Sequence, residues 1–424
     1  MRAEKPIRVA ALVDLPRSPE AGGHVKCWER LGEAAADADL PLDLTVFFSG
    51  PRRTEVLGRG AKLTQLPPLF STAQLKFLPY VPDHTDLAPY HPRLARELPD
   101  FDVIHTTDAF FAFARTAESV SRRRSIPLVT SFHTDTPAYT RIFTRQTIES
   151  RLSGWPARKL IEDWQLPERQ GRRMEQRLAQ HVSRCVFAAA TRPEDHSLAE
   201  SVLGPGRVGN LRLGIDKQVF GPHRAERAAI EQAYGLPAGQ VLALFVGRLD
   251  VGKNIHTLVE AVAAVRAAGL PLHLITAGVG PAADEIRARL GPAATVAGFV
   301  PPHELARLYA SVDLVALASE VEIRSMVGME AMASGAPVLV SRKSGVAELF
   351  DRTAAMRVVD GDARDWACAL SRVVLDPDGR RAMAAAALDY ARRRLASWRE
   401  VLEEDLFALW REAASGPARL ELIA

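Results

Sequence analysis

The stretch that decides the fold is Ala318-Ser-Glu-Val-Glu322-Ile-Arg-Ser-Met-Val-Gly-Met-Glu330-Ala-Met-Ala-Ser-Gly-Ala-Pro-Val338. It follows an apolar run typical of a buried strand, residues 313–318. Glu322 then lies in a polar loop, and Glu330 lies in a segment of small residues typical of a helix. Strand, loop and helix in this order predict an open α/β sheet, which binds ligands at the carboxyl ends of its strands.

The two carboxylates suit one ligand. Glu330 follows Glu322 by eight positions, which on one continuous helix would separate the two carboxylates by roughly 12 Å. With Glu322 in the loop and Glu330 in the helix, both can face the same ligand. Carboxylates only accept hydrogen bonds, so the pair favours a polyhydroxylated partner such as a sugar. The alternative is an acidic surface loop followed by an ordinary helix.

Strand and helix patterns alternate along the whole chain, which predicts parallel sheets covered by helices. One series of apolar strands begins at residues 7–13 and a second begins at residues 241–246. The 424 residues are too many for one ordinary core, and a Gly and Pro cluster at residues 214–222 indicates a linker. We therefore expect two Rossmann-like, doubly wound α/β domains facing a cleft, the first over residues 1–213 and the second over residues 214–395.

Composition favours a soluble protein. The chain is 47% apolar and 25% charged, which is typical of globular proteins, and no run approaches the ~20 apolar residues needed to span a bilayer. The first residues show no signal-peptide cleavage pattern. The cysteines are Cys27, Cys185 and Cys368; they are few and widely spaced, which predicts a reduced, cytoplasmic protein without a disulfide framework or a metal cluster.

A basic excess is confined to residues 141–184, which hold ten Lys and Arg against five Asp and Glu. Trp and Leu are interleaved with these charges, as in helices that lie at an anionic lipid surface. The candidates for contact with a membrane or an acceptor are Tyr139, Arg141, Trp155, Trp164, Arg172, Arg173 and Arg177. The alternative is a solvated helical insertion that packs on the first domain. Nucleic acid is not an expected partner, because no known motif accompanies the charges.

One further motif follows the first strand of each series. Gly22-Gly23-His24 opens a helix, where backbone N–H groups can approach a phosphate. Gly247-Arg248-Leu249 with Lys253 places a planar guanidinium and a mobile ammonium after the strand at residues 241–246. Fixed cations of this kind stabilise the charge that develops on a leaving phosphate. The alternatives are a plain turn and solvated surface cations.

Glu-x7-Glu followed by Ala-Met-Ala-Ser-Gly-x-Pro-Val resembles the signature of retaining glycosyltransferases of family 4, which have the GT-B fold. The resemblance implies that Glu322 binds the donor sugar and Glu330 the nucleotide ribose. It also implies a diphosphate site at Arg248 and Lys253, and a phosphate or sugar site at Gly22 and Gly23. It further implies a nucleotide pocket lined by Gly278, Gly298 and Phe299, and a histidine beside the reacting carbon, His133.

One departure from the family pattern affects the donor. Members usually carry Gly or Thr followed by Phe-Gly after the first Glu, and this chain carries Ile323, Arg324 and Ser325 there. Backbone amides of that turn approach the donor sugar and phosphate in the family. Replacement of the glycine restricts φ > 0 conformations, so the departure bears on donor preference.

The resemblance implies a transferase that uses a nucleotide-diphosphate sugar, UDP-linked, as a substrate, with His133, Arg248, Lys253 and Glu322 as the catalytic set. The context of Phe132-His133-Thr134 and residues 137–141 looks like the glycolipid-forming branch, which makes sulfolipid or glycosyl-diacylglycerol, or mannosylates phosphatidylinositol. It implies a lipid alcohol acceptor at the inner membrane face. In GT-B proteins a terminal helix, here within residues 396–424, crosses back to the first domain; the alternative is a capping helix of the second.

No cofactor is expected, and no metal is assigned. Three Asp-x-Asp strings, which begin at Asp37, Asp360 and Asp376, lie in turns where Asp is common anyway. Two rival functions remain open. One is a nucleotide-sugar epimerase, which would release free sugar and UDP without an acceptor. The other is a non-catalytic GT-B-like binding protein, which the altered loop after Glu322 makes possible.

Overall fold

Two mainly parallel β-sheets form the framework of the structure, a computed structural model that describes residues 5–75, 84–322, 325–350 and 353–416. The chain divides into two compact units. One comprises residues up to Gly214 together with the segment from Trp398 onward, and the other comprises Ile215–Ser397. The sequence analysis set the boundary after residue 213 and the start of the returning segment at residue 396.

The first sheet has β1 (Ile7–Pro16) at its centre, in parallel contact with β2 (Leu42–Ser49) and β5 (Val103–Thr106). Its order is β3-β4-β2-β1-β5-β6-β7-β8, and only the edge strand β3 is antiparallel. The other strands are β3 (Arg53–Gly58), β4 (Ala61–Leu66), β6 (Leu128–Ser131), β7 (Phe187–Ala190) and β8 (Val208–Asn210). Residues 9–13 of β1 are fully buried, as expected of a strand covered on both faces. The helices include α1 (Gly23–Asp37), α2 (Pro92–Glu97), α3 (Ala112–Arg124) and α7 (Pro193–Leu203).

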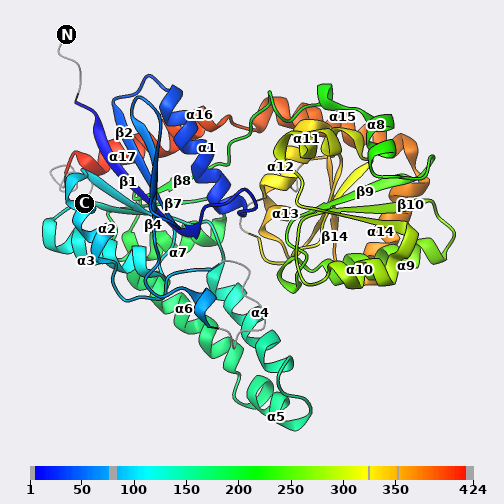
Figure 1. Ribbon diagram of the computed structural model, residues 1–424, viewed down its shortest axis with the longest axis horizontal. Helices are drawn as coiled ribbons and strands as arrows, with labels where there is room; N and C mark the ends of the chain where they lie inside the picture. Colours follow the sequence, from blue (N-terminus) through cyan, green and yellow to red (C-terminus); the bar gives the residue numbers. More distant parts are fainter. Residues whose placement is uncertain (1–4, 76–83, 323–324, 351–352, 417–424) are drawn as a thin grey trace. The chain divides into compact units, whose positions relative to one another are not determined.

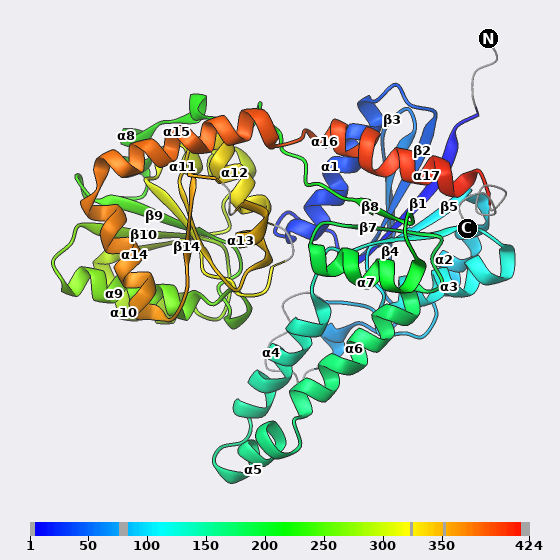
Figure 2. The same cartoon turned by 180° about the vertical axis from the view of Figure 1, so that it is seen from behind.

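The second sheet is parallel throughout, in the order β11-β10-β9-β12-β13-β14. Its strands are β9 (Val241–Val246), β10 (Leu272–Ala277), β11 (Ala294–Gly298), β12 (Leu314–Leu317), β13 (Val338–Ser341) and β14 (Met356–Val359). Its helices are α8 (Arg227–Ala233), α9 (Ile255–Ala267), α10 (Ala283–Leu290), α11 (Pro302–Ser311), α12 (Met326–Ser334), α13 (Gly345–Phe350), α14 (Ala363–Leu375) and α15 (Pro377–Arg394). Figures 1 and 2 show α9, α10 and α14 on one face of the sheet and α11, α12 and α15 on the other. The expected pair of Rossmann-like, doubly wound domains is confirmed.

The returning C-terminal segment is helical, with a π-helical middle. It consists of α16 (Trp398–Glu400), the π-helix η7 (Val401–Phe407) and α17 (Ala408–Ala414), and α17 packs against β1, β5 and β6. Trp398, Leu402, Leu406 and Trp410 are all buried. On an α-helix, a four-residue spacing drifts around the axis by about 40° at each step. The wider turn of a π-helix reverses this drift, so the four side chains stay on one face.

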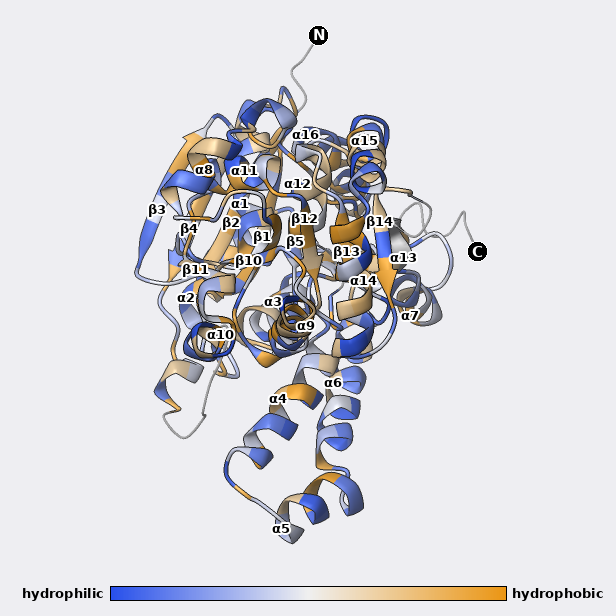
Figure 3. Cartoon of the chain, turned by 90° about the vertical axis from the view of Figure 1, so that its right-hand side faces the viewer, coloured by the Kyte–Doolittle hydropathy of each residue, from blue (hydrophilic) through white to orange (hydrophobic). Residues whose placement is uncertain are grey.

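A helical arm extends from the sheet of the first unit (Figures 1 and 2). It is built from α4 (Thr136–Glu149), α5 (Trp155–Arg158), the π-helix η3 (Lys159–Asp163) and α6 (Leu166–Val182). Ile148, Ala157 and Ile161 form a small core within the arm. Figure 3 shows that hydrophilic residues cover much of α4 and α6. Across the described ranges, no helix combines the length and the apolar character that a membrane span requires.

Candidate active site

The candidate site of the second unit lies where β9 and β12 end side by side. β9 lies between β10 and β12, so the chain order reverses at this point of the sheet. Such reversal points are where open α/β sheets bind ligands. The loop after β9 carries Arg248 and Lys253, and the loop after β12 carries Glu322. The Lys253 ammonium donates a hydrogen bond to Glu322 Oε1, so the structure brings these two predicted residues into contact.

Asp250 holds the cation loop in shape. Its carboxylate is fully buried and accepts hydrogen bonds from Arg248 Nε at 2.9 Å and from the backbone N–H of Lys253 at 3.0 Å. It is also the N-cap of the short helix η5 (Val251–Lys253). The sequence analysis missed Asp250, although an aspartate three residues before Lys253 is a recognisable cap signal. The loop is therefore organised before any ligand binds.

Glu330 lies on α12 and is buried. Tyr309, from α11, donates its hydroxyl hydrogen to Glu330 Oε2 at 3.0 Å. Burial, together with the neighbouring Glu330 carboxylate, raises the pKa of Tyr309 well above its ordinary value, so this phenol keeps its proton and remains a donor. Tyr309 thereby orients the carboxylate, a role that no sequence motif indicates.

The loop that departs from the family pattern is described only in part. Ser325 is the N-cap of α12, and its hydroxyl accepts a hydrogen bond from the backbone N–H of Gly328 at 3.1 Å. Ser325 therefore has a structural role as a helix cap, in addition to the donor-binding role expected from its position. Ile323 and Arg324, also expected to bind the donor, lie outside the described residues.

Three loops at the ends of β9, β10 and β11 are joined through their backbones. Gly247 N–H donates to Ala277 O at 3.0 Å, and Gly278 N–H donates to Gly298 O at 2.7 Å. A Cβ atom on Gly278 would lie 1.9 Å from Gly247 O, and its φ is +153°. Gly278 and Gly298 therefore lie side by side, and their role in a nucleotide pocket stays a prediction. Phe299 follows Gly298 and is exposed.

In the first unit, His133 follows β6 and contacts residues of α1. Trp28 Nε1 donates to His133 Nε2 at 3.3 Å, and the hydroxyl of Ser131 lies 2.8 Å from the same nitrogen. The imidazole of His24 stacks on that of His133 with ring centroids 4.4 Å apart. Gly22 is the N-cap of α1 and Gly23 its first residue. The structure therefore joins His133 to the predicted glycine loop through His24 and Trp28, which the sequence analysis did not assign to the site.

The predicted membrane and acceptor residues lie on the arm. Trp155 and Trp164 are 71% and 51% exposed, and Lys159 Nζ lies 6.0 and 5.8 Å from their ring centroids. Arg172 and Arg173 are exposed on α6. The remaining three make contacts within the first unit: Tyr139 stacks on Phe143, Arg141 pairs with Glu175, and Arg177 pairs with Glu118.

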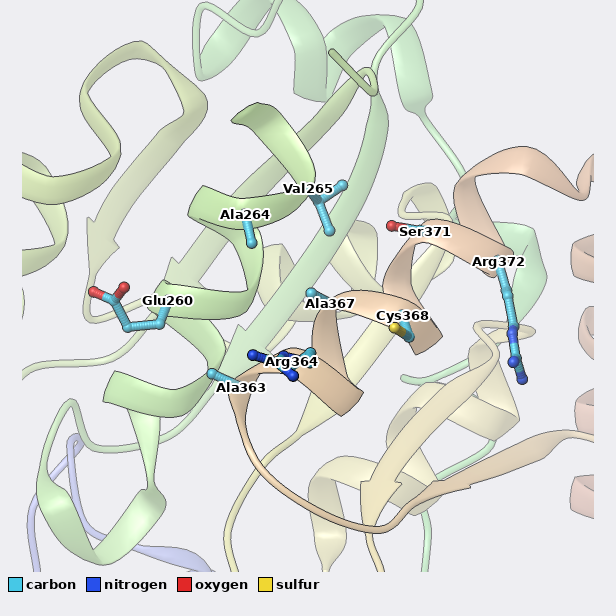
Figure 4. A pocket seen from close by; sticks show the side chains of 9 residues that line it. All are labelled: Glu260, Ala264, Val265, Ala363, Arg364, Ala367, Cys368, Ser371 and Arg372. Carbon is cyan, nitrogen blue, oxygen red and sulfur yellow. The ribbon is translucent and has the colours of Figure 1, made fainter. Parts of the chain in front are cut away.

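Two of the Asp-x-Asp strings contain helix caps, since Asp362 caps α14 and Asp376 caps α15. A hollow between α9 and α14 is shown in Figure 4, where Glu260, Arg364 and Arg372 are among its lining residues. It contains none of the predicted site residues, and it carries neither paired carboxylates nor a glycine loop. The chemistry-bearing groups lie instead at the carboxyl ends of the strands.

The chain resembles known proteins in both units. The chain matches two family models, Glycosyltransferase Family 4 over residues 21–188 and Glycosyl transferases group 1 over residues 226–390. It is 33% identical over 224 residues to the D-inositol 3-phosphate glycosyltransferase of Saccharomonospora viridis, covering 49% of this chain and 51% of the relative. For the same enzyme of a Nocardioides species the identity is 34% over 223 residues, covering 48% of each chain. The chain thus spans about half the length of the curated relatives it matches.

Solved structures extend the likeness over the whole fold. Sucrose-phosphate synthase from Thermosynechococcus elongatus superimposes with a TM-score of 0.67 at 18% identity, covering 96% of this chain and 99% of that chain. HepE from Anabaena in complex with UDP-glucose gives a TM-score of 0.63 at 16% identity, covering 96% and 98%. At these identities the likeness concerns the fold alone, and it confirms the expected GT-B fold class.

The close approach at Gly278 gives a first testable prediction. Gly278→Ala should lower the free energy of unfolding of the second unit by about 2–5 kcal/mol, because it combines an unfavourable φ with a steric overlap. Gly269→Ala is the matched control, since its φ is +79° but, among the described residues, only its chain neighbours have atoms within 4 Å of its Cβ position; it should cost only about 1–2 kcal/mol. Chemical denaturation measures both, and equal losses would contradict the steric argument.

Proposed function

We propose that this protein is a retaining GT-B glycosyltransferase that moves a sugar from a nucleotide-diphosphate donor, UDP-linked, to a lipid alcohol at the inner membrane face. The observation that carries the proposal is the grouping of Arg248, Lys253, Glu322 and Glu330 where the strand order of the second sheet reverses. Cations and sugar-binding carboxylates are the two kinds of group that a sugar nucleotide needs, and here they share one edge of one sheet.

The cations suit the diphosphate. Lys253 carries three N–H donors and Arg248 five, and donors of this kind suit the oxygens of a diphosphate. Loss of the leaving group breaks the bond between the sugar C1 and a phosphate oxygen and leaves negative charge on that phosphate. Arg248 and Lys253 stabilise this charge, and Asp250 keeps both in position.

The carboxylates suit the rest of the donor. Glu322 can accept hydrogen bonds from sugar hydroxyls, while Glu330, held by Tyr309, can accept them from the ribose. The acceptor hydroxyl then bonds to C1 on the face that the phosphate leaves, and its proton passes to the departing phosphate. This route retains the configuration at C1 and needs no nucleophile from the enzyme.

The glycine loop of the first unit supports a ligand-binding role. The φ of Gly22 is −67°, which any residue can adopt, and within the described residues no atom other than those of its chain neighbours lies within 4 Å of its Cβ position. Glycine is a favoured N-cap residue, but Ser, Asn and Asp are favoured more strongly there, so the cap alone does not single out glycine. A phosphate or sugar that approaches the start of α1 would explain it, because a side chain would occupy the same space.

Two acceptor classes follow from different observations. The names of the relatives favour a phosphorylated inositol, whereas the arm favours a lipid. Trp155 and Trp164 are exposed on either side of Lys159, and Trp beside a basic residue is typical of side chains that anchor at a membrane–water interface. We favour the lipid, because two exposed indoles and a basic residue occur together on the arm, a combination that suits a membrane–water interface.

The experiment that tests the function is a screen of UDP- and GDP-sugars, read by mass spectrometry, with a membrane lipid extract, with inositol 3-phosphate, or with water alone. A new glycolipid supports the proposal, and a glycosylated inositol phosphate corrects the acceptor. Epimerised free sugar with UDP and no need for an acceptor would identify an epimerase. Tight UDP-sugar binding without turnover in any arm would identify a binding protein.

The diphosphate site gives the next prediction. Lys253→Ala and Arg248→Ala should each lower turnover about 10²–10³-fold, because each removes a preorganised charge from the leaving phosphate. Lys343→Ala is the matched control, since Lys343 also pairs with a glutamate in the second unit, Glu320 at 2.9 Å. Turnover is measured as UDP release from the active sugar nucleotide. Near-normal rates in the two site variants would contradict the assignment.

The arm gives a prediction about the membrane. Trp155→Ala with Trp164→Ala should weaken binding to vesicles of phosphatidylcholine and phosphatidylglycerol with little dependence on salt. Arg172→Glu with Arg173→Glu should weaken it at least about 30-fold at low salt, at about 1 kcal/mol per basic residue lost. Arg177 is left unchanged, because its reversal would break the ion pair with Glu118.

Vesicle sedimentation at low and high salt measures both effects. Leu375→Ala is the control, because Leu375 is 68% exposed but lies in the second unit. If the wild-type protein does not sediment with anionic vesicles at either salt concentration, the arm is not a membrane anchor. A loss as large for Leu375→Ala as for the tryptophan variant would also contradict the assignment.

A further inference from the structure

Three consecutive hydrogen bonds link Trp410, on the C-terminal segment, to His133. Trp410 Nε1 donates to His105 Nδ1 at 2.8 Å. His105 Nε2 lies 2.7 Å from Ser131 Oγ, and Ser131 Oγ lies 2.8 Å from His133 Nε2. Trp410, His105 and Ser131 are all buried. The chain of contacts thus begins on α17, passes through β5 and β6, and ends at the histidine expected beside the reacting carbon.

The direction of each hydrogen bond follows from the donors available. An indole N–H can only donate, so His105 Nδ1 is unprotonated and accepts from Trp410. A neutral histidine then carries its proton on Nε2, so His105 donates to Ser131 Oγ. Burial lowers the pKa of His105 to about 3, which agrees with a neutral ring at ordinary pH.

A second indole, that of Trp28, determines the direction of the hydrogen bond between Ser131 and His133. Trp28 Nε1–H points at His133 Nε2 at 3.3 Å, so a proton on that nitrogen would place two N–H groups against each other. His133 Nε2 is therefore an acceptor, and Ser131 donates its hydroxyl hydrogen to it. The proton of neutral His133 is then on Nδ1.

We infer that Trp410, His105 and Ser131 are positioning residues that fix His133 as the Nδ1–H tautomer, so that the ring presents a hydrogen-bond donor, and not an acceptor, at Nδ1. This inference rests on the proposed function for its catalytic consequence, but not for the tautomer itself. A sugar hydroxyl or phosphate oxygen can accept that hydrogen bond. A histidine with the opposite tautomer would present a lone pair there instead. The C-terminal segment thereby takes part in the chemistry without contact with substrate.

The tautomer can be read directly by NMR of the full-length protein labelled with ¹⁵N-histidine, because protonated and unprotonated ring nitrogens have widely separated ¹⁵N shifts. His133→Gln identifies the His133 signals. We expect wild-type His133 as the Nδ1–H form and His105 as the Nε2–H form. In Trp410→Phe and in Ser131→Ala, His133 should show a mixture of both forms. Ser131→Thr keeps the hydroxyl and should restore the single form.

Trp398→Phe is the matched control, because it makes the same change at another buried tryptophan of the C-terminal segment. It should leave the His133 tautomer unchanged. In the same variants, UDP release from UDP-glucose reports the consequence. Trp410→Phe and Ser131→Ala should lower kcat about 10–100-fold, with KM for UDP-glucose changed less than about two-fold, as expected for an interaction made in the transition state.

Each outcome decides a separate point. His133 as the Nε2–H form in the wild type, or an unchanged tautomer in both Trp410→Phe and Ser131→Ala, overturns the inference. A changed tautomer with unchanged kcat overturns the catalytic role of the positioning residues. If the wild type releases no UDP from UDP-glucose, the failure concerns the proposed function or its donor, and the NMR result still decides the tautomer.

Discussion

The order of the parallel strands is the constraint on which both candidate sites depend. In each sheet the first strand has parallel neighbours on both sides, and the chain adds strands first on one side and then on the other. β1 lies between β2 and β5, and β9 lies between β10 and β12. Because parallel crossovers are right-handed, the helices after β9 and β12 lie on opposite faces of the sheet, as Figure 1 shows for α9 and α12. The two loops then approach one point from two sides, with cations from one and a carboxylate from the other.

The sequence predicted those parts of the site that depend on local order. Short-range hydrophobic patterns indicate strand, loop and helix, so Lys253, Glu322 and Gly278 could be placed after strands, and Glu330 in the following helix, before any contact was known. Parallel sheets bring such ends to one edge. The ion pair between Lys253 and Glu322 follows from this rule together with the reversal at β9, although neither residue alone indicates its partner.

The parts that could not be predicted depend on contacts between distant segments. Tyr309 has the pattern of an ordinary buried aromatic residue, and its contact with Glu330 is visible only once α11 and α12 pack together. Trp410 and His105 are 305 positions apart in the chain, so no local pattern can relate them. The four-residue spacing in the C-terminal segment was visible, but the π-helix that satisfies it is set by packing against the first sheet. Asp250 differs from these, because its cap signal is local and was missed.

The contact between Lys253 and Glu322 also has an electrostatic reason. A carboxylate that binds the donor sugar must lie near the diphosphate, and two unit charges 4 Å apart interact by about 4 kcal/mol at an effective dielectric constant of 20. An uncompensated Glu322 would therefore repel the donor that it is proposed to bind. Because Lys253 contacts Glu322 directly, the carboxylate can accept sugar hydroxyls while its charge is offset. In the proposed function Lys253 therefore has two roles, since the same ammonium attracts the phosphate and offsets the charge of the neighbouring carboxylate. The proposed function thus depends on the meeting of the loops after β9 and β12, which the reversal of the strand order brings about.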